Sequence, residues 1–250
     1  MTVFTRRQFA LLPVATFAAE TTDLTLPTFA QSVSALLTRP IPSSGEPLPA
    51  VGLGTAAVFE VADATMLQSA RAVVRALIDN GGKLIDTAST YGDAERILGD
   101  TIVPSGLRDK VFIATKLEAP DIEELKRSLN RLRTAKLDLL QLHNVRNPAQ
   151  SLAAFKEWKA QNVCRYIGIT STSHGAFPAV EAVLGREKPD FVQIDYSLDD
   201  REAEKHHAAD GPGDEYGSHG MLLSHPAQSG RLQPVPSFVG IRIRRQGVIP

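Results

Sequence analysis

The sequence predicts an α/β protein, a TIM-type (β/α)8 barrel that is incomplete, with about six strands recognisable. Six short runs rich in Val, Ile and Leu alternate with longer segments of helical periodicity, and after the first run their starts lie 25 to 29 residues apart. These runs begin at Val51, Leu84, Val111, Leu137, Tyr166 and Phe191. A strand–helix unit repeated at this period gives parallel strands joined by helical crossovers. An open doubly wound sheet is disfavoured, because Gly52-Leu53-Gly54 lacks the third glycine of a dinucleotide-binding turn.

The segments between the strands carry the apolar stripe of amphipathic helices. The clearest are Asp63–Asn80, Asp121–Arg133 and a segment that contains Leu152, Phe155 and Trp158. Gly81 and Gly82 are expected to end the first of these helices, since glycine adopts the left-handed conformation that closes a helix. We expect Trp158 to pack in the core rather than to stack on a ligand.

Composition limits the classes of function. The chain has 250 residues, of which 43% are hydrophobic and 22% charged, as in an ordinary globular enzyme. Its formal net charge of −1 gives no electrostatic reason to expect nucleic acid as a partner. Cys164 is the single cysteine, so no intramolecular disulfide can form, and we expect it to be a small buried residue. Four histidines lie between His206 and His225, but without the spacing of metal ligands, so no metal site is expected.

The N-terminus has the features of an export signal. Arg6 and Arg7 precede an uncharged apolar stretch, Phe9–Ala19, which is too short to span a bilayer core of about 30 Å. The arginine pair resembles a twin-arginine signal, which is read by machinery that exports folded proteins. Residues 1–30 are therefore predicted to be a signal peptide, and the mature chain to be periplasmic without a membrane span. The alternative is a disordered arm with a chance arginine pair.

Four chemically active side chains follow successive predicted strands. Asp86 closes the second strand, Tyr91 lies in the loop after it, Lys116 closes the third strand and His143 the fourth. In a barrel, such positions meet at one mouth. Asp86 and Lys116 would each be costly to bury alone, so we expect them to form an ion pair. The lysine would lower the pKa of the tyrosine from about 10, and the phenol could then protonate a carbonyl oxygen.

Each of the four residues also has a structural alternative. Asp86 could cap a turn and Tyr91 could pack in its loop. Lys116 could extend out of the barrel, and His143 could be a hydrogen-bonded histidine on the rim. The catalytic interpretation depends on their occurrence together at consecutive strand ends, because any one of them alone is more often structural.

The order and spacing of several motifs resemble the aldo-keto reductase superfamily, from about Arg39 to Tyr196. The motifs are Arg39–Glu46, Val51-Gly52-Leu53-Gly54-Thr55, Asp86-Thr87-Ala88 with Tyr91-Gly92, Ala114-Thr115-Lys116, Leu137-Asp138-Leu139-Leu140-Gln141-Leu142-His143 and Ile167-Gly168-Ile169-Thr170-Ser171. The first is similar to the hairpin that closes the bottom of the barrel in that family.

The resemblance implies reduction of small aldehydes or ketones to alcohols with NADPH as cofactor. Tyr91 would be the general acid, Lys116 and Asp86 would tune it, and His143 would orient the substrate carbonyl. The implied cofactor-binding residues are Thr55, Asn144, Thr170, Ser171 and Gln193. Ser171 stands where the family has asparagine, which keeps a hydrogen-bonding group but shortens its reach. A metal hydrolase on the same barrel lacks clustered His and Asp ligands at strand ends.

The family pattern stops before a complete barrel. We expect a partial barrel over residues 36–205 and an irregular or disordered tail over 206–250, where Gly and Pro make up 12 of 45 residues. Within this tail only Ser237–Ile243 has a strand-like pattern. A reading-frame shift near Lys205 would explain the change, and a divergent tail is the alternative. Because the segment that holds the cofactor phosphates in the family is unrecognisable, a non-catalytic truncated barrel or binding module is the second functional hypothesis.

Overall fold

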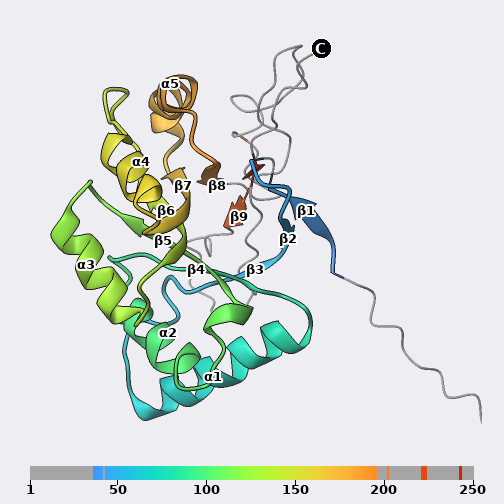
Figure 1. Cartoon of the computed structure of the whole chain (residues 1–250). Helices are drawn as coiled ribbons and strands as arrows, with labels where there is room; N and C mark the ends of the chain where they lie inside the picture. Colours follow the sequence, from blue (N-terminus) through green and yellow to red (C-terminus); the bar gives the residue numbers. More distant parts are fainter. Residues whose placement is uncertain (1–35, 42, 196–201, 203–220, 224–241, 244–250) are drawn as a thin grey trace, which may run out of the picture. The chain divides into compact units, whose positions relative to one another are not determined.

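The computed structural model describes residues 36–41, 43–195, 202, 221–223 and 242–243, all within the compact unit Ala35–Pro250. In this unit six parallel strands form a curled sheet, the half-barrel in Figure 1. The strands are β3 (Gly52–Gly54), β4 (Leu84–Asp86), β5 (Phe112–Leu117), β6 (Leu137–Leu142), β7 (Cys164–Ser171) and β8 (Phe191–Asp195). Each pairs with the next along the chain. The prediction of an incomplete (β/α)8 barrel is therefore confirmed.

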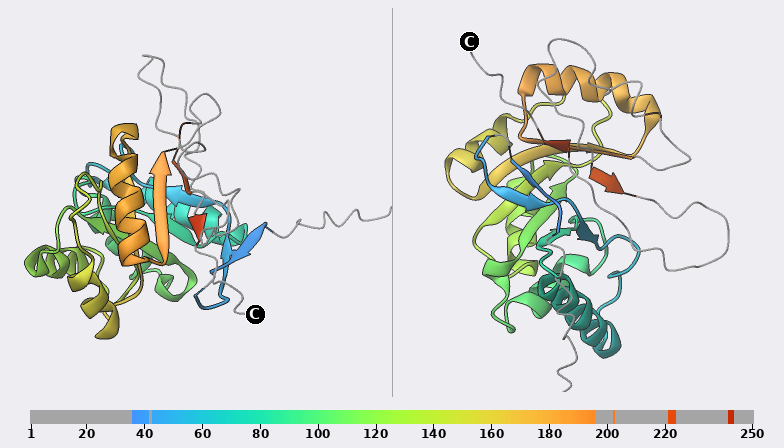
Figure 2. Two further views of the ribbon diagram at one scale, coloured as in Figure 1. Left: turned by 90° about the horizontal axis from the view of Figure 1, so that it is seen from above. Right: turned by 90° about the vertical axis from the view of Figure 1, so that its right-hand side faces the viewer.

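Helices connect the strands and cover the outer face of the sheet (Figure 1), as a second direction of view also shows (Figure 2). They are α1 (Ala64–Asp79), α2 (Ala94–Ile102), α3 (Ile122–Arg131), α4 (Ala153–Ala160) and α5 (Phe177–Glu187), with single 3-10 turns at Arg108–Lys110 and His174–Ala176. The apolar stripes explain this placement, because each helix turns its buried side chains toward the sheet. No helix in the described part of the chain has both the length and the apolar character needed to cross a membrane.

The ends of α1 follow the sequence signals. The side chain of Asp63 accepts a hydrogen bond from the backbone N–H of Met66 at 2.7 Å and so caps the first turn. At the other end Gly81 has φ of +83°, and its N–H donates to the carbonyl of Ile78. The N–H of Gly82 donates to the carbonyl of Leu77. The paired glycines therefore end this helix as predicted.

Trp158 and Cys164 could each have bound a ligand or reacted with a substrate, but both are packed in the core. Trp158 is buried on α4 beside Phe155, with ring centroids 5.3 Å apart. Cys164 is buried at the start of β7, and burial raises the pKa of its thiol to about 12. The thiol is therefore protonated at neutral pH and unsuited to nucleophilic attack. Both residues pack in the core, as predicted.

A β-hairpin closes the end of the half-barrel where the strands begin. It consists of β1 (Thr38–Pro40) and β2 (Pro47–Pro49), which pair antiparallel. The Ser44 hydroxyl lies 2.6 Å from the Tyr166 hydroxyl, and Glu46 forms an ion pair with Arg165. Apolar residues of the hairpin complete an interior cluster, which comprises Ile41, Leu48, Leu84, Phe112, Ala114, Leu139, Tyr166 and Phe191. The expected bottom hairpin is therefore present.

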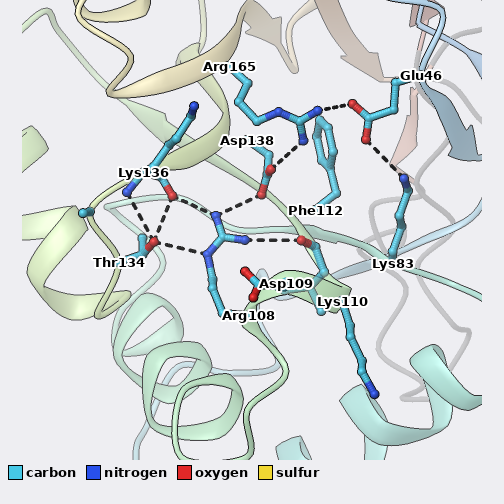
Figure 3. A pocket seen from close by; sticks show the side chains of 12 residues that line it. Glu46, Lys83, Arg108, Asp109, Lys110, Phe112, Thr134, Lys136, Asp138 and Arg165 are labelled. Atoms are coloured by element: carbon cyan, nitrogen blue, oxygen red, sulfur yellow. Dashed lines mark hydrogen bonds and ion pairs between the residues drawn. The ribbon is translucent and has the colours of Figure 1, made fainter.

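A cavity of about 430 Å³ lies beside this hairpin, at the amino ends of the strands (Figure 3). Five of its charged side chains form one chain of ion pairs. Asp138 contacts Arg108 at 3.1 Å and Arg165 at 2.9 Å, and Glu46 contacts Lys83 at 3.2 Å. Because these charges satisfy one another, the cavity is a structural junction between the hairpin and the strand starts.

Two short strands pair with β8 from the C-terminal part of the chain. They are β9 (Met221–Leu223), parallel to β8, and β10 (Arg242–Ile243), antiparallel to it. β10 lies within the expected Ser237–Ile243, but the prediction of no other strand there was wrong. β9 forms because of the tertiary structure. The edge of β8 offers backbone N–H and C=O groups, and a three-residue apolar run can pair with them. The predicted signal peptide and the rest of the predicted tail lie outside the described residues.

Candidate active site

The four predicted catalytic residues meet at the carboxyl ends of neighbouring strands. Asp86 is the last residue of β4, Lys116 is the fifth residue of β5, and His143 follows β6 directly. Tyr91 lies in the loop between β4 and α2. Parallel pairing of β4, β5 and β6 brings these ends to one edge of the sheet. The carboxylate, ammonium, imidazole and phenol therefore form one cluster.

Asp86 and Lys116 form a buried ion pair. Lys116 Nζ lies 2.8 Å and 2.7 Å from the two carboxylate oxygens and also donates to the carbonyl of Thr87 at 2.7 Å. Both residues are only 1% exposed. Burial raises the pKa of Asp86 and lowers that of Lys116, and the attraction between the two charges opposes both changes. The ion pair expected from the sequence is thus present.

Two glutamines extend this ion pair into the barrel interior. Gln193 of β8 hydrogen-bonds the Asp86 carboxylate, which favours its charged form. Gln141 of β6 donates through Nε2 to Gln193 Oε1 at 2.9 Å. The carboxylate is therefore held by the ammonium on one strand and by an amide chain from two others. These contacts can hold the lysine in one position, while Gln141 Oε1 is buried without a hydrogen-bond partner among the described residues.

Tyr91 packs against both the lysine and the histidine. Lys116 Nζ lies 4.9 Å from the centroid of the Tyr91 ring, and the ring of His143 meets it edge-on, with centroids 5.8 Å apart. Burial raises the pKa of Tyr91, and the charges of Asp86 and two further carboxylates raise it more. The expected lowering of this pKa was wrong, because burial, which is the largest cause, and the negative charges around the phenol all raise it. Tyr91 is therefore a protonated phenol at neutral pH.

The backbone at Tyr91 explains why a glycine follows it. Gly92 has φ of +51°, and a Cβ atom there would lie 2.7 Å from the carbonyl oxygen of Glu60. The N–H of Asp93 donates to the same carbonyl. Only glycine tolerates both the left-handed conformation and this close approach. The Tyr91-Gly92 pair therefore fixes the turn that presents the phenol.

His143 contacts a carboxylate that the sequence analysis did not identify. Its Nδ1 lies 2.6 Å from Glu118 Oε1 and 3.5 Å from the Thr90 hydroxyl oxygen. Burial and, to a smaller extent, the charge of Lys116 lower the pKa of His143 from 6.5 to about 4, although Glu118 acts in the opposite direction. The imidazole is therefore neutral at pH 7.

The lowered pKa of His143 predicts a pH dependence of stability. Below pH 6.5 the histidine is protonated in the unfolded chain but remains neutral in the folded one, so stability should fall from pH 6.5 toward about 4. Urea unfolding at pH 7.0 and 5.0 measures this loss, and His143→Asn should reduce it. An equal loss in the variant would show that other groups cause it.

The predicted cofactor-binding residues fall into two groups. Thr55 and Gln193 are buried and contact Asp86, since the Thr55 hydroxyl donates to its carbonyl at 3.0 Å. At the outer ends of β6 and β7, the Thr170 hydroxyl accepts the N–H of Asn144 at 2.9 Å, and the Ser171 hydroxyl lies 3.3 Å from the backbone of Ser173. Thr170 and Ser171 are also buried, and each of their hydroxyls keeps an unused hydrogen-bonding position. No group of potential metal ligands occurs among the residues described.

Residues 50–209 match the profile of the Aldo/keto reductase family.

The chain belongs to the aldo/keto reductase family.

Curated relatives cover the same part of the chain. Methylglyoxal reductase YeaE of Escherichia coli is 34% identical over 164 residues, which are 62% of this chain and 56% of the relative. Aldo-keto reductase YhdN of Bacillus subtilis is 32% identical over 175 residues, 62% of this chain and 52% of the relative. The chain therefore spans about half the length of the curated relatives that it matches.

Solved structures agree with the family assignment. An aldo-keto reductase from Klebsiella pneumoniae in complex with NADPH superposes with a TM-score of 0.56 at 29% identity, over 67% of this chain and 61% of that one. AKR11C1 from Bacillus halodurans, in its holo form, gives a TM-score of 0.58 at 26% identity, over 68% of this chain and 61% of that one. The half-barrel is thus a recognisable part of an aldo/keto reductase barrel.

Sequence reasoning missed two polar residues of this aldo/keto reductase site. Glu118 follows Lys116 by two residues, in the bend directly after β5, and nothing in its spacing indicates that its carboxylate reaches the ring of His143. Gln141 lies inside the motif that ends in His143, but nothing in that motif indicates that its amide reaches β8. Its contact with Gln193 depends on the closeness of the two strands, which only the fold provides.

Proposed function

We propose that this aldo/keto reductase chain reduces aldehydes or ketones to alcohols with NADPH as the hydride source. The observation that carries the proposal is the packing of Tyr91 against the buried Asp86–Lys116 ion pair, with His143 edge-on to the phenol. A protonated phenol beside a fixed ammonium can give up its proton to an oxygen that is gaining negative charge.

Each residue then has a distinct task. Tyr91 donates its hydroxyl proton to the carbonyl oxygen of the substrate. Lys116 stabilises the phenolate left behind, which matters because the surrounding carboxylates raise the pKa of Tyr91. Asp86 keeps the lysine charged and in place, and His143 orients the substrate beside the phenol. NADPH, when bound, supplies the hydride that reaches the carbonyl carbon.

The rim formed by Asn144, Thr170 and Ser171 is proposed to hold the carboxamide of the nicotinamide. Asn144 follows His143 directly, Thr170 and Ser171 end β7, and the two hydroxyl groups keep unused hydrogen-bonding positions. The NADPH complex of the aldo-keto reductase from Klebsiella pneumoniae supports the choice of cofactor.

A non-catalytic barrel is the second candidate function. The observation that favours it is that Thr55 and Gln193 are buried and already bonded within the chain, so they offer little to a cofactor in this arrangement. On this view the ion pair would have a structural role, and the chain would act as a binding module.

Titration with NADPH separates the two candidates. We expect saturable enhancement of NADPH fluorescence by the purified chain, followed by NADPH oxidation when a simple aldehyde is added. Ser171→Ala should weaken binding, while Ser105→Ala, in the exposed turn after α2, should not. Absence of saturable binding would favour the non-catalytic barrel.

Export through the twin-arginine route remains a proposal that depends on Arg6 and Arg7. Because this route carries folded proteins, an exported reductase could take bound NADPH with it. Cell fractionation tests the proposal. Periplasmic recovery that persists after both arginines are replaced by lysine would contradict it.

A further inference from the structure

In the described part of the chain, Glu118 is the one carboxylate within hydrogen-bonding distance of His143. Its Oε1 atom lies 2.6 Å from His143 Nδ1. The Glu118 side chain is 48% exposed, so it lies at the edge of the site, whereas the imidazole is buried. The contact therefore links a half-exposed carboxylate to a buried imidazole ring.

The chemistry of the two groups determines where the proton lies. An ionised carboxylate can only accept hydrogen bonds, so a contact of 2.6 Å requires a hydrogen atom on Nδ1. A neutral imidazole carries a single N–H. When that hydrogen atom is on Nδ1, Nε2 has a lone pair and can only accept.

The charges around the ring agree with a neutral imidazole. Lys116 from β5 and Arg146 from the loop after β6 both disfavour the imidazolium, and burial does so more strongly. Glu118 favours the imidazolium, but its exposure to solvent weakens that effect. Tyr91, the remaining titratable group against the ring, is an uncharged phenol at this pH.

We propose that Glu118 is a positioning residue that fixes neutral His143 as the Nδ1–H tautomer, so that Nε2 is a hydrogen-bond acceptor. The consequence for catalysis rests on the proposed reductase function. An acceptor suits a hydroxyl group, such as that of the alcohol product, better than a carbonyl oxygen. Tyr91 is then the donor to the carbonyl oxygen, and His143 orients the hydroxyl partner.

The tautomer can be measured by two-bond 1H–15N correlation spectra of the 15N-labelled full chain at pH 7, with the His143 signals assigned from their loss in His143→Asn. We expect the wild-type spectrum to show the Nδ1–H pattern. Glu118→Leu removes the acceptor and should move His143 to the Nε2–H pattern. Glu118→Gln keeps an acceptor oxygen without charge, so it should keep the Nδ1–H pattern while lowering the pKa of His143.

Glu123→Leu is the matched control, because Glu123 is an exposed glutamate of α3 whose partner is Lys126. It should leave the His143 signals unchanged. An Nε2–H pattern in the wild-type chain, or the same tautomer in wild type and Glu118→Leu, would overturn the proposal. These spectra need neither cofactor nor turnover, so failure of the reductase function would leave the tautomer assignment standing, and the reverse also holds.

Discussion

Replacing Tyr91 with phenylalanine is expected to lower kcat for aldehyde reduction by about 10²–10⁴-fold, the range typical of a lost general acid. The substitution removes one hydroxyl and keeps the ring that packs against Lys116 and His143. Stability to urea and affinity for NADPH should therefore change little. Initial rates of NADPH oxidation at saturating aldehyde measure the effect.

Tyr166→Phe is the control for this experiment. Tyr166 is a buried tyrosine whose hydroxyl contacts Ser44 and Glu46 at the opposite end of the strands. Its removal should lower stability without a comparable loss of kcat. Equal losses of kcat in the two variants would mean that Tyr91 acts through the fold and not as an acid.

Replacing Lys116 with methionine should lower the free energy of unfolding by about 3–5 kcal/mol, because the Asp86 carboxylate would be left buried without its counter-charge. The side chains have similar volume, so packing is largely kept. Guanidinium chloride unfolding at pH 7 measures this loss. Lys126→Met removes an exposed ion pair with Glu123 and should change stability little.

The double variant Asp86→Asn with Lys116→Met separates the lost charge pair from lost packing. Because it removes both charges, it should recover much of the stability lost in the single variant, yet it should remain inactive. If the double variant is as unstable as Lys116→Met alone, the buried carboxylate is not the source of the loss.

Most of the fold was predictable because its signals are local. Strand starts and helix stripes follow from side-chain periodicity, and the glycines after α1 act within a single turn. β9 was not predictable in this way, since Met221–Leu223 is a three-residue run without alternation. It becomes a strand only because the edge of β8 lies beside it.

The candidate site was predictable where the apolar run next to a charged residue shows that the residue is buried. Asp86 and Lys116 had to pair, because each lies at the carboxyl end of a buried strand and neither could be buried alone. The direction of the pKa shift of Tyr91 was not predictable, because it depends on burial in the folded site and on charges from several segments of the chain. The contact between Glu118 and His143 likewise joins two loops that the sequence separates.

We propose that these residues form a site at which a carbonyl group is reduced. The most direct test is incubation of the full chain with an aldehyde and NADPH dideuterated at C4 of the nicotinamide, followed by mass spectrometry of the alcohol. We expect one deuterium atom on the former carbonyl carbon with the wild-type chain and almost no labelled alcohol with Tyr91→Phe. Unlabelled alcohol, or as much labelled alcohol from the variant as from the wild-type chain, would contradict this proposal.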